Sequence, residues 1–328
     1  MKKFKLPKDL GSMVQPEPVS IVPEMVKGRR CHIDGDFLAY FAAGGENMPI
    51  SICRQVVRER AEKFRVMTGS ESILLQLSDN RCTKGDRVFI SATQPYQGQR
   101  LSGKKPGNWQ ATREYIDSGA HGIPMKVWKT READDGAAYC AETQSGGLDA
   151  ICTKDKDWRM FAGLHCIWDT FQLVQVNPGD FRVDGPAPVK DKNGKTPLQK
   201  YYGHFFFWQQ MLYGDTADHI PGIHGIGEAT AAQLLLDCAC NFDAFNVVAD
   251  IYAKKKRAAW ADYMVEQAAL LWMRTDRHAD LLDFLKIFPE DEEIIIAAEK
   301  MKQRVIEDKR QLEEILNGYQ LSTGRSHP

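Results

Sequence analysis

The sequence predicts an α/β fold with a mostly parallel sheet, followed by a helical C-terminal region. Strand-like and helical segments alternate over residues 30–176, whereas from Tyr201 onward almost every signal is helical. Such alternation is typical of a parallel sheet whose strands are connected by helices. Acidic clusters also lie at or just beyond the ends of strand-like segments, or open a helix, which is where α/β folds present functional groups.

The N-terminal elements follow from the period of the apolar residues. Residues 30–42 begin with a strand pattern and then change to a helical one. A helix is expected at 51–67, because Val56, Val57, Ala61 and Phe64 fall on one helical face. The other expected elements are strands at 72–77, 125–130, 148–152 and 167–176, and a helix at 109–118.

Three parts are expected along the chain. Residues 1–29 form an extended N-terminal segment, 30–200 the α/β domain, and 201–328 the helical region, which ends in a long amphipathic helix at 291–316. Residues 91–108 are rich in glycine and polar groups, which predicts a mobile loop or short helix within the first domain. Residues 184–200 have the composition of a connector.

The bulk properties are those of a soluble globular protein. The chain has 328 residues, of which 43% are hydrophobic and 27% charged. It contains no apolar run long enough for a transmembrane helix, and the lysine-rich start lacks the apolar core of a secretory signal. The eight cysteines show no regular framework, so reduced thiols and a cytoplasmic location are expected. The net charge of −1 gives no overall sign of nucleic-acid binding, although a local basic patch can still attract DNA.

The acidic clusters predict a metal site. They comprise Asp34, the group Glu132, Asp134 and Asp135, the pair Asp155 and Asp157, and the pair Asp215 and Asp218. Carboxylates brought together repel one another unless a cation compensates them. Oxygen ligands suit Mg²⁺ or Mn²⁺ better than zinc. Taken singly, the clusters also fit helix capping at residues 132–135, and turns or a cap at the two pairs. Together they predict a metal-dependent enzyme that acts on phosphate esters.

A glycine-rich segment at 219–231 predicts a backbone-binding hairpin. Gly222, Gly225 and Gly227 allow tight turns and close approach to another molecule, and a helix is expected from Glu228. Backbone N–H groups at such a helix start can hold phosphate. The pattern is that of a helix-hairpin-helix, which grips the DNA backbone without reading bases. An ordinary connection between two helices is the alternative.

The loop at 91–108 joins an aromatic residue to basic groups. Tyr96, Arg100, Lys104 and Lys105 suit stacking on a base and contact with the phosphates of a single strand. A solvated loop is the alternative for these residues when they are considered alone.

Together these motifs resemble the flap-endonuclease/5′-nuclease superfamily, and most closely the tailed-phage 5′→3′ exonucleases. The resemblance is carried by Ile33-Asp34-Gly35-Asp36, by Glu132-Ala133-Asp134-Asp135, and by the segments 153–158, 214–227 and 270–274. It implies a PIN-like α/β nuclease core followed by a helical helix-hairpin-helix region. The metal ligands or their close supports that it implies are Asp34, Asp79, Glu132, Asp134, Asp135, Asp155, Asp157, Asp215 and Asp218.

The resemblance also implies an arch with a Tyr-Lys-x-x-Arg pattern. Here the pattern is Tyr96-Gln97-Gly98-Gln99-Arg100, so that Gln97 stands where the family has lysine. Arg100 and Lys104 are therefore the expected catalytic cations, and Tyr96, Lys105 and the three hairpin glycines are the expected DNA contacts. Two or more Mg²⁺ ions are implied, with Mn²⁺ as a substitute, and a K⁺ ion at the hairpin.

The implied function is metal-dependent 5′→3′ exonuclease and flap-endonuclease activity. The substrate would be duplex DNA with a 5′ end, flap or nick, and RNA primers in hybrids, during phage replication in a host bacterial cytoplasm. No membrane partner is expected. A PIN-type ribonuclease is an alternative enzyme, although such domains lack the hairpin, and a non-catalytic DNA-binding protein with a nuclease fold is the alternative outside enzymes.

Overall fold

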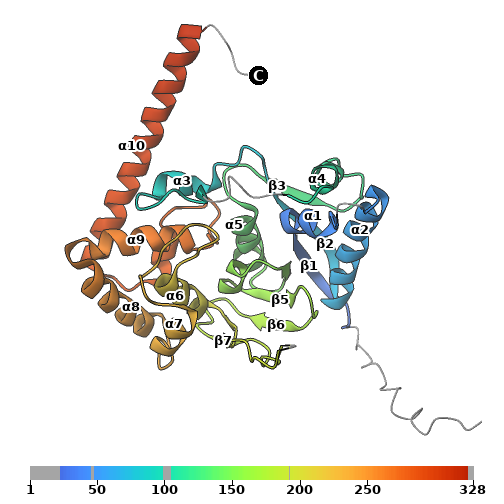
Figure 1. Ribbon diagram of the computed structural model, residues 1–328, viewed down its shortest axis with the longest axis horizontal. Helices are drawn as coiled ribbons and strands as arrows, with labels where there is room; N and C mark the ends of the chain where they lie inside the picture. The colour runs from blue at the N-terminus through green and yellow to red at the C-terminus, as the bar shows by residue number, and fades with distance from the viewer. Residues whose placement is uncertain (1–22, 46–47, 99–104, 192, 324–328) are drawn as a thin grey trace, which may run out of the picture.

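The centre of the structure is a six-stranded sheet in the order β3-β2-β1-β4-β5-β6 (Figure 1). The computed structural model describes residues 23–45, 48–98, 105–191 and 193–323. The strands are β1 Val26–Asp34, β2 Ser70–Ser78, β3 Met125–Trp128, β4 Ala150–Thr153, β5 Gly163–Ile167 and β6 Leu173–Val176. All neighbouring strands are parallel except β5 and β6. The expected α/β fold with a mostly parallel sheet is therefore confirmed.

Helices cover both faces of this sheet. The helices of the N-terminal part are α1 Gly35–Ala42, α2 Ile50–Met67, α3 Arg87–Ile90, α4 Trp109–Asp117 and α5 Ala133–Ala138. Side chains of α1, α2 and α4 share one buried cluster with Cys152 of β4. Ile151, the preceding residue of β4, belongs to a second cluster with Ala137 and Ala138 of α5. Successive side chains of a strand point to opposite faces, so β4 is buried on both sides.

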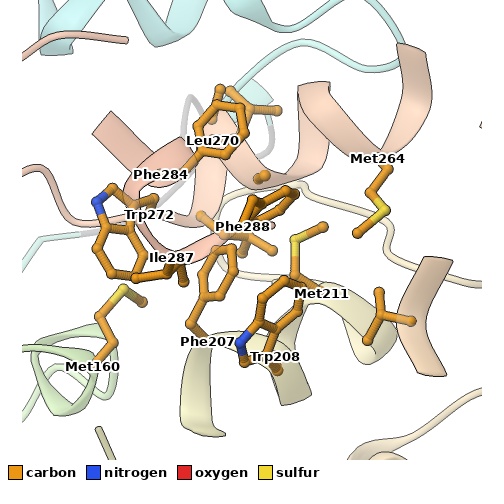
Figure 2. Packing of buried hydrophobic residues seen from close by; sticks show 14 of the residues in the cluster. Met160, Phe207, Trp208, Met211, Met264, Leu270, Trp272, Phe284, Ile287 and Phe288 are labelled. Atoms are coloured by element: carbon orange, nitrogen blue, oxygen red, sulfur yellow. The ribbon is translucent and has the colours of Figure 1, made fainter. Parts of the chain in front are cut away.

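The C-terminal region is helical and packs directly against the sheet layer. Its helices are α6 His204–Tyr213, α7 Glu228–Leu234, α8 Asn241–Lys256, α9 Trp260–Leu271 and α10 Glu292–Thr323. Figure 2 shows Phe207, Trp208 and Met211 of α6 packed among aromatic side chains from the segment after α9. Met160, which follows β4, belongs to the same cluster. One hydrophobic core therefore runs across residue 200, where the sequence suggested a connector.

Short turns complete the described fold. They are the 3₁₀ turns Lys84–Asp86, Asp157–Met160, Arg257–Ala259 and Asp283–Ile287, the π-helical turn Tyr139–Gln144, and a small antiparallel sheet of β7 Val183–Asp184 and β8 Tyr201–Tyr202. Helix α10 extends beyond the rest of the fold at its C-terminal end (Figure 1). Within the described ranges, no helix combines the length and apolar character needed to cross a membrane.

Three sequence expectations need correction in detail. The strand expected at 167–176 is a hairpin of β5 and β6, which turns at Phe171 with φ of 57°. Tyr201 begins β8, and the helical part starts only at His204. Strand β1 begins at Val26, inside the segment expected to be an extended tail, because Val26 pairs with Ser70 of β2.

Candidate functional site

The carboxyl ends of β1 and β4 bring the first acids together. Asp34 is the last residue of β1, and Asp155 lies two residues after Thr153, the last residue of the neighbouring parallel strand β4. The Asp34 carboxylate caps α1 by accepting a hydrogen bond from the Phe37 backbone N–H at 2.8 Å. Its second oxygen accepts a hydrogen bond from the Thr153 hydroxyl, also at 2.8 Å. The two strand ends thus fix Asp34 before any ligand binds.

The start of α5 adds a further acid to the same edge of the sheet. Asp134 lies in the first turn of α5 and accepts a hydrogen bond from the Trp158 indole N–H at 2.5 Å. A cavity of about 610 Å³ opens between these groups. Its lining includes the acids Asp34, Asp36, Glu132, Asp134, Asp155 and Asp218 and the cations Lys84, Lys154 and Lys156.

Burial and mutual repulsion disfavour the charged form of the carboxyl groups in this cavity. Burial, together with the nearby charge of Asp36, raises the pKa of Asp34 to about 7. Burial and the charges of Asp155 and Asp34 raise the pKa of Asp134 well above its ordinary value. Such shifts mark a site where bound cations would supply the missing compensation. The donor set is all oxygen, which fits Mg²⁺ or Mn²⁺.

A second group of acids lies beside the first. Carboxylate oxygens of Asp157, Asp215 and Asp218 lie within 4.8 Å of one another, a spacing that can hold a cation. Burial and the charge of Asp155 raise the pKa of Asp157 to about 8. Lys156 partly neutralises the group through contacts to Asp157 at 3.1 Å and to Asp215 at 2.5 Å.

The glycine-rich segment forms a tight loop between α6 and α7. Gly214 and Gly222 pack back to back, because a Cβ on Gly222 would lie 2.4 Å from the Gly214 nitrogen, and both have positive φ. The Gly222 N–H donates to the Gln267 side-chain oxygen at 3.0 Å, and Gly222 is buried. The expectation that Gly222 contacts DNA is therefore corrected, since its donor is used inside the fold. Gly225 and Gly227 are exposed.

The base of the loop at 91–108 folds down onto the acids. The Tyr96 hydroxyl donates to Glu132 at 3.0 Å and to Asp218 at 3.2 Å. The Gln97 amide N–H donates to the same two carboxylates, at 3.5 and 3.2 Å. Tyr96 is thus held against the site, which corrects the expectation that it is presented for stacking on a base.

The remaining residues expected in this loop divide into two groups. Arg100 and Lys104 lie outside the described residues. Lys105 is exposed and its ammonium group lies 3.3 Å from the centroid of the Trp109 ring, at the start of α4. Lys105 is therefore open to solvent at the described end of the loop.

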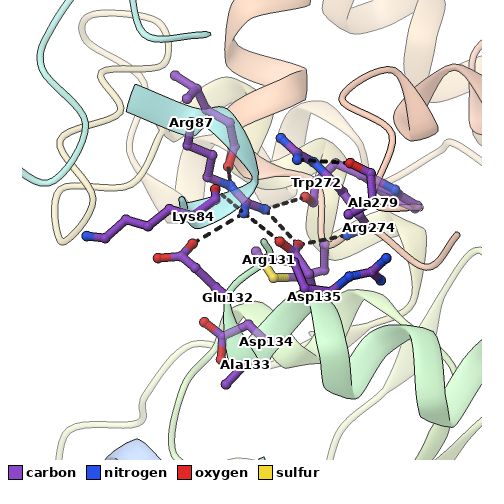
Figure 3. A network of polar contacts seen from close by, with 12 residues as sticks. Lys84, Arg87, Arg131, Glu132, Ala133, Asp134, Asp135, Trp272, Arg274 and Ala279 are labelled. Atoms are coloured by element: carbon purple, nitrogen blue, oxygen red, sulfur yellow. Dashed lines mark hydrogen bonds and ion pairs between the residues drawn. The ribbon is translucent and has the colours of Figure 1, made fainter. Parts of the chain in front are cut away.

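Asp135 has a structural role that the sequence did not reveal (Figure 3). Its two carboxylate oxygens accept hydrogen bonds from the buried Arg87 guanidinium at 2.7 and 2.8 Å, and one also accepts from the Arg274 backbone N–H at 3.0 Å. Burial alone would raise the pKa of Asp135, but the Arg87 charge lowers it below the ordinary value. Asp135 is therefore an ion-pair partner turned away from the cavity, and its expected role as a metal ligand is corrected.

Asp79 is also kept out of the cavity. It follows β2 and its carboxylate accepts a hydrogen bond from the Arg81 backbone N–H at 2.8 Å, which closes a local turn. Ser78, the preceding residue, lines the cavity, whereas Asp79 does not. A turn explains Asp79 better than metal binding does.

Asp36, Lys84 and Lys156 are among the cavity residues that the sequence reasoning did not propose. Asp36 lies beside Asp34 in the same motif and forms an ion pair with Arg113 of α4 at 2.5 Å. Its place two residues after Asp34 was a usable signal. Lys156 lies between Asp155 and Asp157 in the segment 153–158, and contacts Asp157 as well as the distant Asp215. Lys84 lines the cavity through tertiary structure, and no local pattern marks it.

Comparisons with known proteins agree with this geometry. No family model matches the chain. The chain is 30% identical over 220 residues to DNA polymerase I of Deinococcus radiodurans. The aligned residues are 62% of this chain and 20% of the polymerase. It is 33% identical over 116 residues to a 5′-3′ exonuclease of Aquifex aeolicus. The aligned residues are 35% of this chain and 36% of the relative. The chain therefore spans well under two thirds of the length of either relative.

Solved structures show the same fold. A flap endonuclease of bacteriophage T5, crystallised in a product complex with DNA and metal ions, superposes with a TM-score of 0.53 and 12% identity, covering 84% of this chain and 99% of the other. The T5 5′-exonuclease with bound zinc superposes with a TM-score of 0.51 and 14% identity, covering 84% of this chain and 100% of the other. At this identity the likeness concerns the fold.

Proposed function

We propose that the chain belongs to the 5′-nuclease/flap endonuclease family and that it is a metal-dependent 5′→3′ exonuclease and flap endonuclease acting on DNA. The observation that carries this proposal is that acidic side chains from distant parts of the chain lie close together. Asp34, Asp134 and Asp155 line one cavity, and Asp157, Asp215 and Asp218 form a second group beside it. Asp218 also lines that cavity, so the two groups are continuous.

The metal assignment follows from the chemistry of these groups. We assign Asp34, Asp134 and Asp155 to one Mg²⁺ and Asp157, Asp215 and Asp218 to another, with Mn²⁺ as a substitute. Glu132 faces the cavity between them and supports the arrangement through Tyr96 and Arg87. Bound at these positions, such ions supply Lewis-acid activation of water and stabilisation of the leaving oxygen.

The protein groups around the acids hold and orient the substrate. Exposed Gly225 and Gly227 offer backbone N–H groups to duplex phosphates, which carry no base information. A K⁺ ion held by carbonyls of the same loop is part of the proposal. Lys105 and, outside the described residues, Arg100 and Lys104 contact the strand that carries the 5′ end.

The biological setting is proposed from the resemblance and the neighbours. The substrates are 5′ ends, flaps and nicks in duplex DNA, and RNA primers in hybrids, processed during phage replication in a host cytoplasm. The nuclease part is 30–200 and the DNA-holding part 201–328, although both share one hydrophobic core. The T5 structure that contains DNA and metal ions supports a DNA substrate.

Two alternative functions differ from the nuclease in the structural features that they would need. A PIN-type ribonuclease would cut RNA and would not need the loop between α6 and α7. A DNA-binding protein without activity would not need acids whose raised pKa values call for cations. The loop and the acids together therefore favour the nuclease.

One set of assays tests the proposal. Labelled 5′-flap, nicked duplex, single-stranded DNA and RNA–DNA hybrid are incubated with protein in Mg²⁺ or in EDTA. Asp134→Asn and Asp155→Asn are expected to lose cleavage while they keep the fold and most DNA binding. Asp250→Asn, an exposed change on α8, serves as the matched control. Normal cleavage by a well-folded Asp134→Asn variant would refute the assignment.

A further inference from the structure

Lys84 occupies an unusual position at the edge of the acidic cavity. It lines the cavity together with Asp34, Glu132 and Asp134, and its backbone has φ of 54°, a left-handed conformation that non-glycine residues rarely adopt. Figure 3 shows its side chain extending on the same side as the Glu132 carboxylate. Strained backbone of this kind persists where the surroundings over-determine it, and it is often found at functional sites.

The turn that carries Lys84 is held from several directions. The Lys84 carbonyl accepts a hydrogen bond from the Arg87 guanidinium at 3.4 Å, and the Gly85 N–H donates to the Thr130 carbonyl at 3.1 Å. A side chain at Gly85 would collide with the Arg274 guanidinium at 2.3 Å. The backbone beneath Lys84 is thus fixed by the buried ion-pair network, so the direction of its side chain is constrained.

Lys84 differs from the other two lysines of the cavity in its partner. Lys156 forms ion pairs with Asp157 and Asp215, and Lys154 forms one with Asp169 at 3.1 Å on the surface. Lys84 instead contacts the side-chain oxygen of Gln97. Among the described residues no carboxylate forms an ion pair with Lys84. Its charge is held by a neutral acceptor and so remains available to an anion.

Gln97 is suited to this arrangement because its amide has both an acceptor and a donor. The oxygen accepts from Lys84, while the N–H₂ group donates to Glu132 and Asp218. A lysine at position 97 would place a second ammonium group against Lys84, and like charges at contact distance repel. Among the described residues, the glutamine thus holds Lys84 without a direct ion pair to an acid and leaves its ammonium group at the cavity.

We propose that Lys84 is a catalytic residue that contacts a non-bridging oxygen of the scissile phosphate, and that Gln97 positions it. The proposal rests on the nuclease function argued above. During hydrolysis the water oxygen bonds to phosphorus, the bond from phosphorus to the leaving oxygen breaks, and that oxygen takes up a proton. Lys84 keeps its own proton and stabilises the negative charge that develops on the phosphate, which is the role of a pre-positioned donor.

The test compares three variants by single-turnover cleavage of a labelled 5′-flap in Mg²⁺ at saturating enzyme. Lys84→Met keeps the length of the side chain and removes the charge, and a rate about a hundredfold slower is expected, as for loss of one such donor. Lys84→Arg restores a cation and is expected to recover at least part of that loss. Lys63→Met, an exposed change on α2, is the matched control and should cleave at the wild-type rate.

A second measurement separates chemistry from structure. DNA affinity in EDTA and the thermal midpoint of Lys84→Met should stay close to wild type. The double variant Lys84→Gln with Gln97→Lys exchanges the two side chains of the contacting pair, so that the cation stands at position 97. It should cleave faster than Lys84→Gln alone. A purely structural role would not produce this rescue.

The outcomes distinguish the two proposals. A Lys84→Met variant that cleaves at the wild-type rate overturns the role of Lys84 while the nuclease function stands. Slow cleavage by Lys84→Met with a lowered thermal midpoint and no recovery in Lys84→Arg or the double variant also overturns it, in favour of a structural role. If the wild-type protein cleaves none of the substrates in Mg²⁺ or Mn²⁺, the nuclease function fails and this role falls with it.

Discussion

Replacing Asp157 by asparagine should stabilise the metal-free protein and weaken its response to metal. The substitution keeps the shape of the side chain. The asparagine oxygen can still accept the hydrogen bond that Gln210 donates to Asp157 at 2.7 Å. The new amide N–H₂ group can donate toward Asp215 and Asp218, whose oxygens lie within 4.8 Å. What disappears is a buried negative charge beside two others.

The magnitude follows from the raised pKa of Asp157. The pKa rises from 3.8 to about 8, so the folded state binds the proton more tightly than the unfolded state does. Stability is therefore lost as the pH rises from 3.8 toward 8, and the loss reaches about 5 kcal/mol at pH 8. The attraction to Lys156 is already contained in that pKa. About 1 kcal/mol is offset by the burial of the amide. The net expectation is a gain of about 4 kcal/mol in EDTA at pH 8.

The assay is thermal unfolding at pH 8 in EDTA and in Mg²⁺. A gain of about 4 kcal/mol corresponds to a rise of about 6 °C in the midpoint for a chain of this size. The wild-type midpoint should rise on adding Mg²⁺. That of Asp157→Asn should rise less, because the variant keeps the site of Asp34, Asp134 and Asp155, and cleavage should be lost. Asp250→Asn, at an exposed position of α8, is the control for removal of a negative charge. A lower midpoint in EDTA, or an unchanged Mg²⁺ response, would refute the reasoning.

The remaining predictions concern the hairpin, pH and the buried ion pair. Gly227→Glu meets no atom within 4 Å, so the fold should persist while duplex affinity falls about tenfold for all sequences alike, as measured by fluorescence anisotropy; unchanged affinity would exclude the loop from the interface. Because the pKa of Asp34 is about 7, Mg²⁺ must displace a proton at pH 6, and the Mg²⁺-induced rise in thermal midpoint should be larger at pH 8 than at pH 6. Asp135→Asn leaves the buried Arg87 charge poorly compensated and should destabilise the fold by about 3–5 kcal/mol in denaturant unfolding, opposite in sign to Asp157→Asn; a stabilised variant would contradict the ion-pair role.

Sequence patterns alone predicted the α/β order, the parallel sheet and the place of most acids. These features depend on local rules. The apolar period selects strand or helix, and the carboxyl ends of neighbouring parallel strands meet at one edge whatever the rest of the chain does. Asp34 is the last residue of β1, and Asp155 lies two residues beyond the end of β4, as the strand patterns predicted. The tight loop between α6 and α7 was likewise readable from its glycines.

Only the tertiary structure decided which of several similar residues faces the cavity. Asp134 and Asp135 are neighbours on one helix turn, yet Asp135 is turned into a contact with Arg274, which lies 139 residues further along the chain. Gly222 looked like Gly227 until the buried Gln267 proved to accept its N–H. Lys84 carried no motif at all. The orientation of each such side chain is decided by its hydrogen-bond and ion-pair partners from distant parts of the chain. Those partners come close only because the helical region packs on the sheet, and no local pattern encodes that packing.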